Sequence, residues 1–397
     1  MSHNPSSPQI ETEERERLLR ILAAITFLIF FQAYMVAPLI PRLSTAFGVS
    51  EQRIGLLVPA YLIPYGISTL FFGLLSDRIG RKRIMLFSLL AFAGLTALTA
   101  TSTSATQIIL WRLLTGLGAS GVVPLALVLI GTLFPFKERG RSLGWLFGAM
   151  AGGMAFGSTL GVILEPLIGW RGVFLGVSVC GFVATFLLRP YLSMLGERPS
   201  ARTLTLRNVM TGYKQLLSKP RAQRTYFFVL LNAVFHSGVF TWLGLYFSRR
   251  FGLGEIGIGI ALLGYGVPGF VLGPFIGRAA DRWGRRWLVP AGIGVAALSA
   301  FLLAPAWSIA FAVLVVTTLS LGYDMTQPLL GGIVTALDPK RAGQAMGLNV
   351  FTLFIGFGLG SLLFQFLLPL GFSEALGIFG GVQALAGLAA IAMFRTE

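Results

Sequence analysis

Apolar runs of about 20 residues, separated by short polar or basic stretches, recur along the whole chain. A helix needs about 20 apolar residues to cross the hydrocarbon core of a bilayer, so each run predicts a membrane-spanning helix. The pattern therefore predicts an all-α membrane protein. Twelve spanning helices are expected near residues 20–41, 54–76, 84–103, 106–134, 142–165, 169–188, 225–248, 256–278, 287–305, 307–337, 342–368 and 373–394.

The distribution of basic residues along this pattern predicts an orientation. If both termini lie on one side of the membrane, that side carries 25 Lys and Arg residues and the opposite loops carry 5. Loops rich in Lys and Arg stay in the cytoplasm, so both termini are expected there, in a multi-pass protein of the cell (inner) membrane. Because the net charge of +16 lies mainly in these loops, nucleic acid is not an expected partner.

An internal repeat with a constant offset of 204 residues relates two halves of the chain. The sequence GLLSDRIGRK at 73–82 recurs as GRAADRWGRR at 277–286, and the same offset maps Pro124 onto Pro328. Matches in two separate pairs of spans indicate that the halves are homologous. The expected parts are a cytoplasmic N-terminal segment 1–19, a six-helix bundle 20–188, a cytoplasmic basic linker 189–224 and a six-helix bundle 225–397.

The repeated loop resembles the hallmark loop of the major facilitator superfamily, and the resemblance covers almost the whole chain. It implies two pseudo-symmetric six-helix bundles, with a latch in which the loop Asp stabilises the outward-facing state through charge-assisted bonds. Alternatively, the basic residues only hold the loop in the cytoplasm. The second copy is expected to be weaker, because Arg278 and Ala279 interrupt its pattern. The gating-loop residues are Gly73, Asp77, Arg78, Gly80, Arg81, Lys82, Asp281, Arg282, Gly284 and Arg285.

Two further motifs agree with this resemblance. Arg112, with Gly116 and Gly118, resembles the fourth-helix arginine motif of the superfamily. Glycines of the fifth span match the spacing of its drug-antiporter motif, although Ser158 and Val162 replace a Pro and a Gly. The resemblance points to the twelve-helix drug or sugar:proton antiporter (efflux) branch. It implies that these glycines pack against the eighth helix across the interface; packing within one half is the alternative. They are Gly144, Gly153, Gly157 and Gly161.

Ionisable residues inside a span are costly and are candidates for function. Asp324 lies near the middle of the tenth span and shares a polar stripe with Ser320 and Gln327. Burial favours the neutral form of a carboxyl group, so Asp324 could take up and release a proton. The alternative is a carboxylate paired permanently with a neighbouring donor. A proton route would use Asp324, His236, Glu165 or a combination of them.

Other polar residues lie within the predicted spans. Asn232 and His236 share one helix face at i, i+4. His236, which the repeat maps onto Gln32, can change protonation near neutral pH or remain a neutral hydrogen-bonding residue. Arg112 either reaches the outer interface with its long side chain or, as the resemblance implies, faces the cavity.

Aromatic side chains with polar tips complete the candidates, since such a lining suits an amphipathic or planar ligand. Some of them will instead serve packing. The candidate substrate-binding or coupling residues are Gln32, Tyr34, Arg112, Asn232, His236, Trp242, Tyr323, Asp324 and Gln327.

The resemblance implies a secondary transporter that moves a small organic solute by alternating access, with proton-coupled export of a drug, sugar or metabolite as the leading expectation. A uniporter, a proton-coupled importer and an amphiphile or lipid flippase are the alternatives. The sequence holds no phosphate-binding loop of the G-x-x-x-x-G-K-[S/T] type, and no metal cluster or catalytic constellation. No enzymatic activity, metal or cofactor is therefore expected. The expected partners are a small-molecule substrate, protons and membrane lipid, and the chain is expected to be a monomer.

Overall fold

The computed structural model describes residues 8–134, 136–195, 206–268, 272, 275–276, 279, 282–305, 307–338 and 341–397. These residues are almost entirely helical, and no strand occurs among them. The first half contains α1 (Pro8–Tyr34), η1 (Ala37–Leu39), α2 (Ile40–Phe47), α3 (Glu51–Gly55), α4 (Leu57–Ile79), α5 (Arg81–Ala100), α6 (Ala105–Ala119), α7 (Val122–Leu133) and α8 (Phe136–Leu188). The connection contains η2 (Arg189–Leu195) and α9 (Leu206–Leu217). The second half contains α10 (Pro220–Phe251), α11 (Glu255–Leu262), α13 (Arg285–Leu303), α14 (Ile309–Asp324), α15 (Gln327–Leu337), α16 (Ala342–Leu367), η4 (Leu368–Leu370) and α17 (Phe372–Met393).

Ten helical segments of the described chain are long and apolar enough to cross a membrane. One of them, Gly144–Met194, has 51 residues, about 77 Å of helix at ~1.5 Å per residue, which exceeds the ~30 Å hydrocarbon core. It bends at Gly169, whose φ of +69° is open to glycine and strained for other residues. The eighth expected span lies partly outside the described residues. The count of twelve spans therefore stays a prediction.

Two expected spans are each divided into two helices. The span 106–134 breaks between α6 and α7, and the span 307–337 breaks between α14 and α15. The offset of 204 maps Ser120, at the first break, onto Asp324, at the second. A proline ring clashes with the carbonyl four residues earlier, and Pro124 and Pro328 place that clash at these two residues. The break is therefore repeated in both halves, where the sequence pattern predicted one uninterrupted span each.

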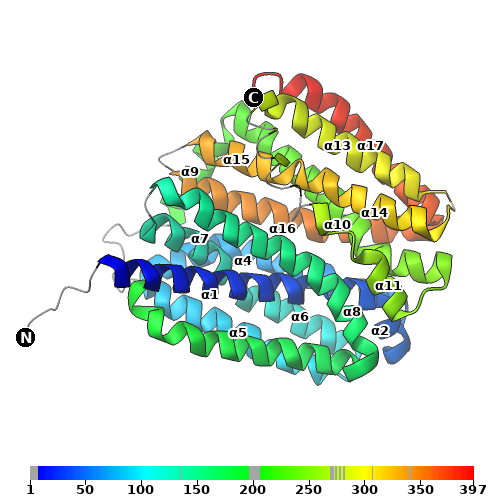
Figure 1. Cartoon of the computed structure of the whole chain (residues 1–397), viewed down its shortest axis with the longest axis horizontal. Coiled ribbons are helices and arrows are strands. Elements are labelled where there is room, and N and C mark those ends of the chain that lie inside the picture. Colours follow the sequence, from blue (N-terminus) through cyan, green and yellow to red (C-terminus); the bar gives the residue numbers. More distant parts are fainter. Residues whose placement is uncertain are drawn as a thin grey trace, which may run out of the picture.

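The two halves lie side by side, with α10 and α16 of the second half next to the first half (Figure 1). The strongest contacts between halves join α4 to α16, α8 to α11 and η1 to α10. We call the end of the molecule near α9 the linker end, and the end near α2 and α11 the far end (Figure 1).

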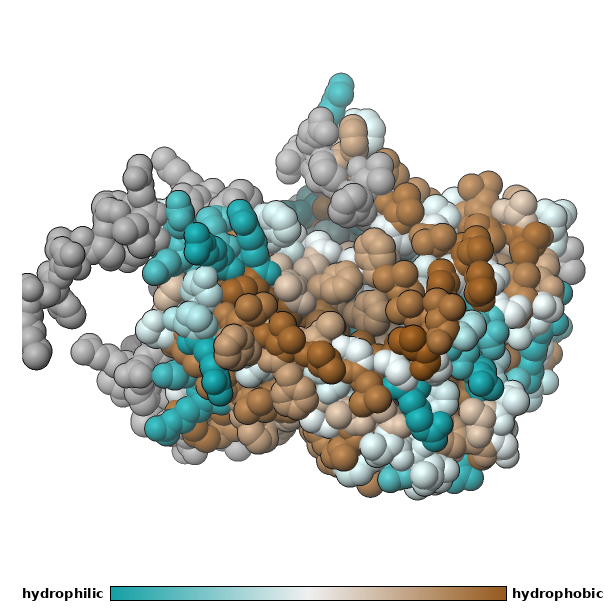
Figure 2. Space-filling model, turned by 60° about the horizontal axis from the view of Figure 1, so that its bottom comes forward, coloured by the Kyte–Doolittle hydropathy of each residue, from teal (hydrophilic) through white to brown (hydrophobic). Residues whose placement is uncertain are grey.

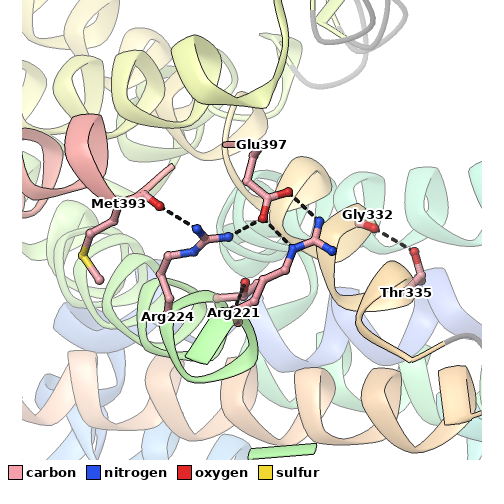
Figure 3. A network of polar contacts seen from close by, with 7 residues as sticks. Arg221, Arg224, Gly332, Thr335, Met393 and Glu397 are labelled. Carbon is pink, nitrogen blue, oxygen red and sulfur yellow. Dashed lines mark hydrogen bonds and ion pairs between the residues drawn. The ribbon is translucent and has the colours of Figure 1, made fainter. Parts of the chain in front are cut away.

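The second half has a separate hydrophobic core at the linker end. Leu216 of α9, Leu330 of α15 and Phe394 belong to it, whereas the main core extends through both halves. Beside it, Glu397 accepts hydrogen bonds from Arg221 Nε and Nη2, both at 2.6 Å, and from Arg224 (Figure 3). The start of α10 is thereby tied to the residues that follow α17.

The molecular surface carries many large apolar side chains. Figure 2 shows them gathered across the middle of one face, with polar residues toward both ends. Phe186, Phe366 and Leu385 are each about two-thirds or more exposed, at 67%, 73% and 68%. Such patches are unfavourable in water, and a lipid bilayer covers them without requiring hydrogen bonds. The surface therefore fits a protein embedded in a membrane.

Candidate substrate site

A small pocket lies between the two halves, midway along the helices. Its side chains lie so close together that they leave no room for a water molecule, whereas ligand sites usually enclose roughly 300–1,000 Å³. Both halves contribute to it, so their relative position sets its size. The lining residues are Tyr34, Met154, His236, Ser237, Phe240, Tyr265, Tyr323 and Phe357.

Aromatic rings form most of the pocket wall. The Tyr34 ring centroid lies 5.8 Å from that of Phe240 and 6.1 Å from that of Phe357. The His236 and Tyr323 rings lie 4.8 Å apart in an edge-to-face arrangement. These separations are those of favourable aromatic pairs. The rings come from helices that are far apart in the sequence, so the wall exists only when the halves pack together.

Several polar atoms at this wall are buried without a hydrogen-bond partner in the described structure. They are the Tyr34 hydroxyl, the Ser237 hydroxyl and both ring nitrogens of His236. An unsatisfied buried polar group costs about 1–3 kcal/mol. Groups left in this condition are candidates for binding a ligand, because a ligand would supply the missing partners.

Asp324 lies beside the pocket, at the last residue of α14. Its Oδ2 accepts a hydrogen bond of 3.2 Å from the Ser320 hydroxyl. The carboxyl is close enough to Tyr265 and Tyr323 for its charge to act on both hydroxyl groups. The protonation of a carboxyl group at a helix break, next to buried aromatic rings, can change when water or a charged group enters the pocket.

A hydrogen-bond network fixes the break between α14 and α15. Asn232 Nδ2 donates to Thr326 Oγ1 at 2.8 Å, and Thr326 Oγ1 donates to the Gly322 carbonyl at 2.9 Å. Gln383 Nε2 donates to Asn232 Oδ1 at 3.4 Å. Asn232 thus positions the broken helix and does not line the pocket. The sequence pattern did not predict the roles of Thr326 and Gln383. Gln383 could have been recognised as a candidate, because it carries a lone amide within the apolar last span.

Arg112 is completely buried and does not reach the outer interface. Its guanidinium donates to the carbonyls of Gln32 and Ala33 at 3.0 Å each, and of Leu57 at 3.2 Å. It also lies 4.4 Å above the centroid of the Tyr61 ring. The last carbonyls of a helix lack partners in the helix itself. Arg112 satisfies two of these at the end of α1, so its contacts are structural ones.

The remaining predicted residues lie in different places. The Gln32 side-chain amide and Gln327 Oε1 are buried without partners in the described structure. Trp242 lies toward the far end, where its Nε1 donates to the Ser361 carbonyl at 3.1 Å and its ring leaves no room for a Cβ on Gly55. Of the nine predicted residues, the pocket itself brings together Tyr34, His236 and Tyr323.

A family model described as Major Facilitator Superfamily matches residues 22–263 and 248–397. The chain belongs to this superfamily. The chain is 25% identical to an uncharacterized MFS-type transporter of Bacillus subtilis (strain 168), over 94% of both chains. It is 24% identical to Multidrug resistance protein 1 of the same organism, over 89% of this chain and 91% of that protein.

A solved structure of a POT family transporter in complex with 5-aminolevulinic acid has the same fold. The TM-score is 0.79, with 15% identity, and the alignment covers 96% of each chain. At this identity the likeness shows the fold alone. Together with the family match, it identifies the chain as a membrane transporter of the superfamily.

Three of the fifth-span glycines of this transporter lie against the first helix or its end, within the same half. A Cβ on Gly153 or Gly157 would collide with α1, and one on Gly161 would collide with Met35, just after α1. Gly144 has no atom of the described residues within 4 Å of its Cβ position. Among the described residues, the nearest neighbours of Gly153, Gly157 and Gly161 thus agree with packing within one half, and a contact with the eighth helix stays a prediction. Close contact across the halves comes instead from Gly259 and its neighbours in the second half, which lie against α8. The positions of glycine alone do not reveal which helix each one faces.

The two copies of the superfamily loop share one backbone feature. Gly80 and Gly284 precede α5 and α13 with φ of +100° and +79°, values that favour glycine. The side chains of Asp77 and Arg78 lie outside the described part of the structure, as does Asp281. The surroundings of Gly73 are not described either. Arg81, Lys82, Arg282 and Arg285 are described, but the latch itself stays a prediction.

Contacts at the far end close the space between the halves. Arg249 Nη2 lies 2.5 Å from Glu51 Oε2, which joins α10 to α3. Gly244 of α10 lies against Pro38 of η1 so closely that a Cβ would overlap the proline backbone. Contacts between the halves continue past the pocket, where the Tyr65 ring stacks on that of Phe354 with a centroid distance of 4.2 Å. We call the Glu51–Arg249 pair the far-end latch.

Proposed function

We propose that this transporter exports a small organic solute in exchange for protons by alternating access. The observation that carries the proposal is the pocket, which both halves build and which lies midway between the ends. Rocking of the halves about such a midplane site would open it to one side and then the other. Similarity to a multidrug resistance protein supports a drug or another organic solute as cargo.

We further propose twelve spans with both termini cytoplasmic, divided as 20–188 and 225–397 around the basic linker. The bias of 25 basic residues to 5 supports this orientation. In it the far end faces outward and the state described is closed to the outside. A cysteine placed in 189–224 should be labelled only from the cytoplasmic side, and one near Gly254 only from outside. Opposite labelling would reverse the orientation.

Asp324 is the proposed carrier of the coupled proton. It lies at a helix break next to the pocket, with Ser320 on its own helix and Tyr265 and Tyr323 within electrostatic reach. His236 of α10 packs against Tyr323. A dry surrounding favours the neutral carboxyl group, and contact with water or with a cation favours the carboxylate. Alternation between these conditions is what exchange of a proton for a solute requires.

Flux of candidate solutes in proteoliposomes tests this function directly. The purified transporter should accumulate solute against its gradient when a pH gradient is imposed, and should only equilibrate it without one. Equal accumulation with and without the pH gradient would refute proton coupling. Flux that follows the solute gradient alone would identify a uniporter.

A further inference from the structure

The basic residues at the linker end differ in how their charges are compensated. Arg221 and Arg224 both pair with Glu397. Arg282 and Arg286 are exposed, and neither forms an ion pair within the part of the chain that the structure describes. The charges of these two arginines are therefore available to a partner outside the protein.

Two exposed tryptophans lie next to these arginines. The exposed fractions of Trp283 and Trp287 are 59% and 58%, and the Arg286 guanidinium lies 5.7 Å from the centroid of the Trp287 ring. The offset of 204 maps the two tryptophans onto Ile79 and Arg83, so the first copy of the loop has no aromatic residue at these positions. Indole rings favour the interface between membrane and water, where lipid head groups lie. The start of α13 therefore combines free positive charge with interfacial aromatic rings.

One face of α13 continues from Trp287 as an exposed strip beside α17 (Figure 1). Ala291, Gly294 and Leu298 follow at helical spacing and are exposed, and no atom of the described residues lies within 4 Å of a Cβ placed on Gly294. Leu298 comes 11 positions after Trp287, a rise of ~16 Å, which is about half of the ~30 Å hydrocarbon core. The small side chains between the indole ring and Leu298 leave a shallow strip as long as one leaflet is thick.

From this arrangement we infer that the start of α13 binds an anionic phospholipid. Arg282 and Arg286 donate charge-assisted hydrogen bonds to the phosphate oxygens, the indole rings lie at the level of the glycerol, and an acyl chain covers the strip at Gly294. Free phosphate would use neither the rings nor the strip, so a lipid is the ligand that accounts for all three features. A zwitterionic lipid brings its own cation, which offsets the attraction of its phosphate to the arginines.

The leaflet that supplies this lipid follows from the proposed orientation, in which the linker end is cytoplasmic. Anionic lipids give the cytoplasmic leaflet its negative surface potential. If cysteine labelling reversed the orientation, the lipid would come from the other leaflet, but the residues that bind it would be the same. Binding in detergent, where no leaflets exist, therefore tests the site independently of the proposed function.

Quenching of tryptophan fluorescence by brominated lipids tests the inference. Phosphatidylglycerol and phosphatidylcholine with the same brominated acyl chains are titrated separately into the purified full chain in detergent. Phosphatidylglycerol should reach half-maximal quenching at a mole fraction about 5- to 30-fold lower, as expected for one or two arginines that contact the head group. Excess inorganic phosphate should not displace it, relative to chloride at equal ionic strength. Equal mole fractions for the two lipids, or displacement by phosphate, overturns the inference.

Paired variants locate the binding to the start of α13. Trp283→Phe combined with Trp287→Phe keeps aromatic rings at the interface and should remove the quenching that saturates at low phosphatidylglycerol. Arg286→Gln should raise the half-saturating mole fraction about fivefold. Arg83→Gln removes an exposed charge from the first turn of α5 and is the matched control, with a change of at most about twofold.

Two outcomes with these variants would contradict the inference. Unchanged quenching in the double tryptophan variant would place the lipid elsewhere on the protein. An equal rise in Arg286→Gln and Arg83→Gln would show a general effect of charge without a site at α13. If Arg286→Gln does not fold, the comparison of the two lipids on the unmodified chain decides.

Discussion

The breaks in α6–α7 and α14–α15 are equivalent in backbone but different in chemistry. The first carries Ser120, whose hydroxyl donates to the Leu117 carbonyl at 2.9 Å. The second carries Asp324, next to the pocket, and Thr326, which Asn232 of another helix holds in place. A proline four residues after Ser120 or Asp324 disfavours a continuous helix in both halves.

The difference indicates how two homologous halves divide their tasks. In the first half the buried cation Arg112 donates to three backbone carbonyls and thereby stabilises the end of α1. In the second half the polar groups at the break lie beside a space that both halves enclose. We therefore expect substitutions near the first break to affect stability, and substitutions near the second to affect transport.

Substitution at the two equivalent positions gives the largest expected contrast. Asp324→Asn resembles the protonated carboxyl group, so it should abolish proton-driven accumulation while exchange down the solute gradient continues. Ser120→Ala removes a single local hydrogen bond and should leave accumulation close to that of the unmodified chain. Proteoliposome uptake with a pH gradient measures both. Uphill transport by Asp324→Asn with an unchanged pH profile would make Asp324 structural, and His236 and Glu165 the next candidates.

The two copies of the superfamily loop provide the next comparison. Asp77→Asn should strongly reduce turnover while the protein still inserts, because the first copy is the complete one. Asp281→Asn should have a milder effect, because Arg278 and Ala279 interrupt the second copy. Initial transport rates, normalised to inserted protein, decide between them. A normal rate for Asp77→Asn would reject the latch predicted for the first superfamily loop. A larger loss of rate in Asp281→Asn than in Asp77→Asn would show that the second copy of the loop is the more important one.

The structural role assigned to the first half can be tested through Arg112. Arg112→Met leaves three carbonyls without their donor, so the free energy of unfolding should fall by about 2–3 kcal/mol. Thr326→Val removes one hydrogen bond in the second half and should cost about 0.6–1 kcal/mol. Thermal unfolding in detergent measures both variants. If Arg112→Met were as stable as the unmodified chain but could not bind solute, the division of tasks proposed above would be wrong.

The far-end latch joins the halves, whereas the Arg42–Glu165 pair lies within one. Exposed ion pairs contribute about 0.2–1 kcal/mol, so Glu51→Gln should shift the population open at the far end by at most about fivefold. Arg42→Gln should not shift it. A cysteine at Ser361, in a Cys180→Ser background, reports opening through its reaction rate with an impermeant maleimide. An equal rate increase in both variants would show that the Glu51–Arg249 pair has no special role.

The smallest expected effect concerns the linker end of the second half. Hydrogen bonds from Arg221 hold the pKa of the Glu397 carboxyl below its ordinary value. Its contribution to stability is present above the unfolded pKa, about 4.3, and is lost as the pH falls through the lower folded value. Glu397→Gln should lower the free energy of unfolding by at most about 1 kcal/mol at neutral pH. Melting temperatures of the two proteins should converge in acid; a constant difference would contradict this linkage.

The sequence by itself determined the membrane character, the repeat and the family. Hydrophobic run length reflects the thickness of the bilayer core, which is the same for every helix. The helix breaks at Ser120 and Asp324 could also have been predicted from the sequence, because each residue lies four positions before a proline. Pro64 and Pro290 lie inside continuous helices, however, so proline alone does not decide where a helix divides.

Only the tertiary structure decided which side chains meet. The pocket unites Tyr34, His236 and Tyr323 with Ser237, Phe240 and Phe357, whose apolar or small side chains gave no signal within apolar spans. The contacts of Arg112 and of the fifth-span glycines were likewise set by neighbouring helices. In lipid every face of a helix can be apolar, so the sequence pattern does not show how each helix is rotated. The packing of helices from two halves fixes those rotations, and with them the site.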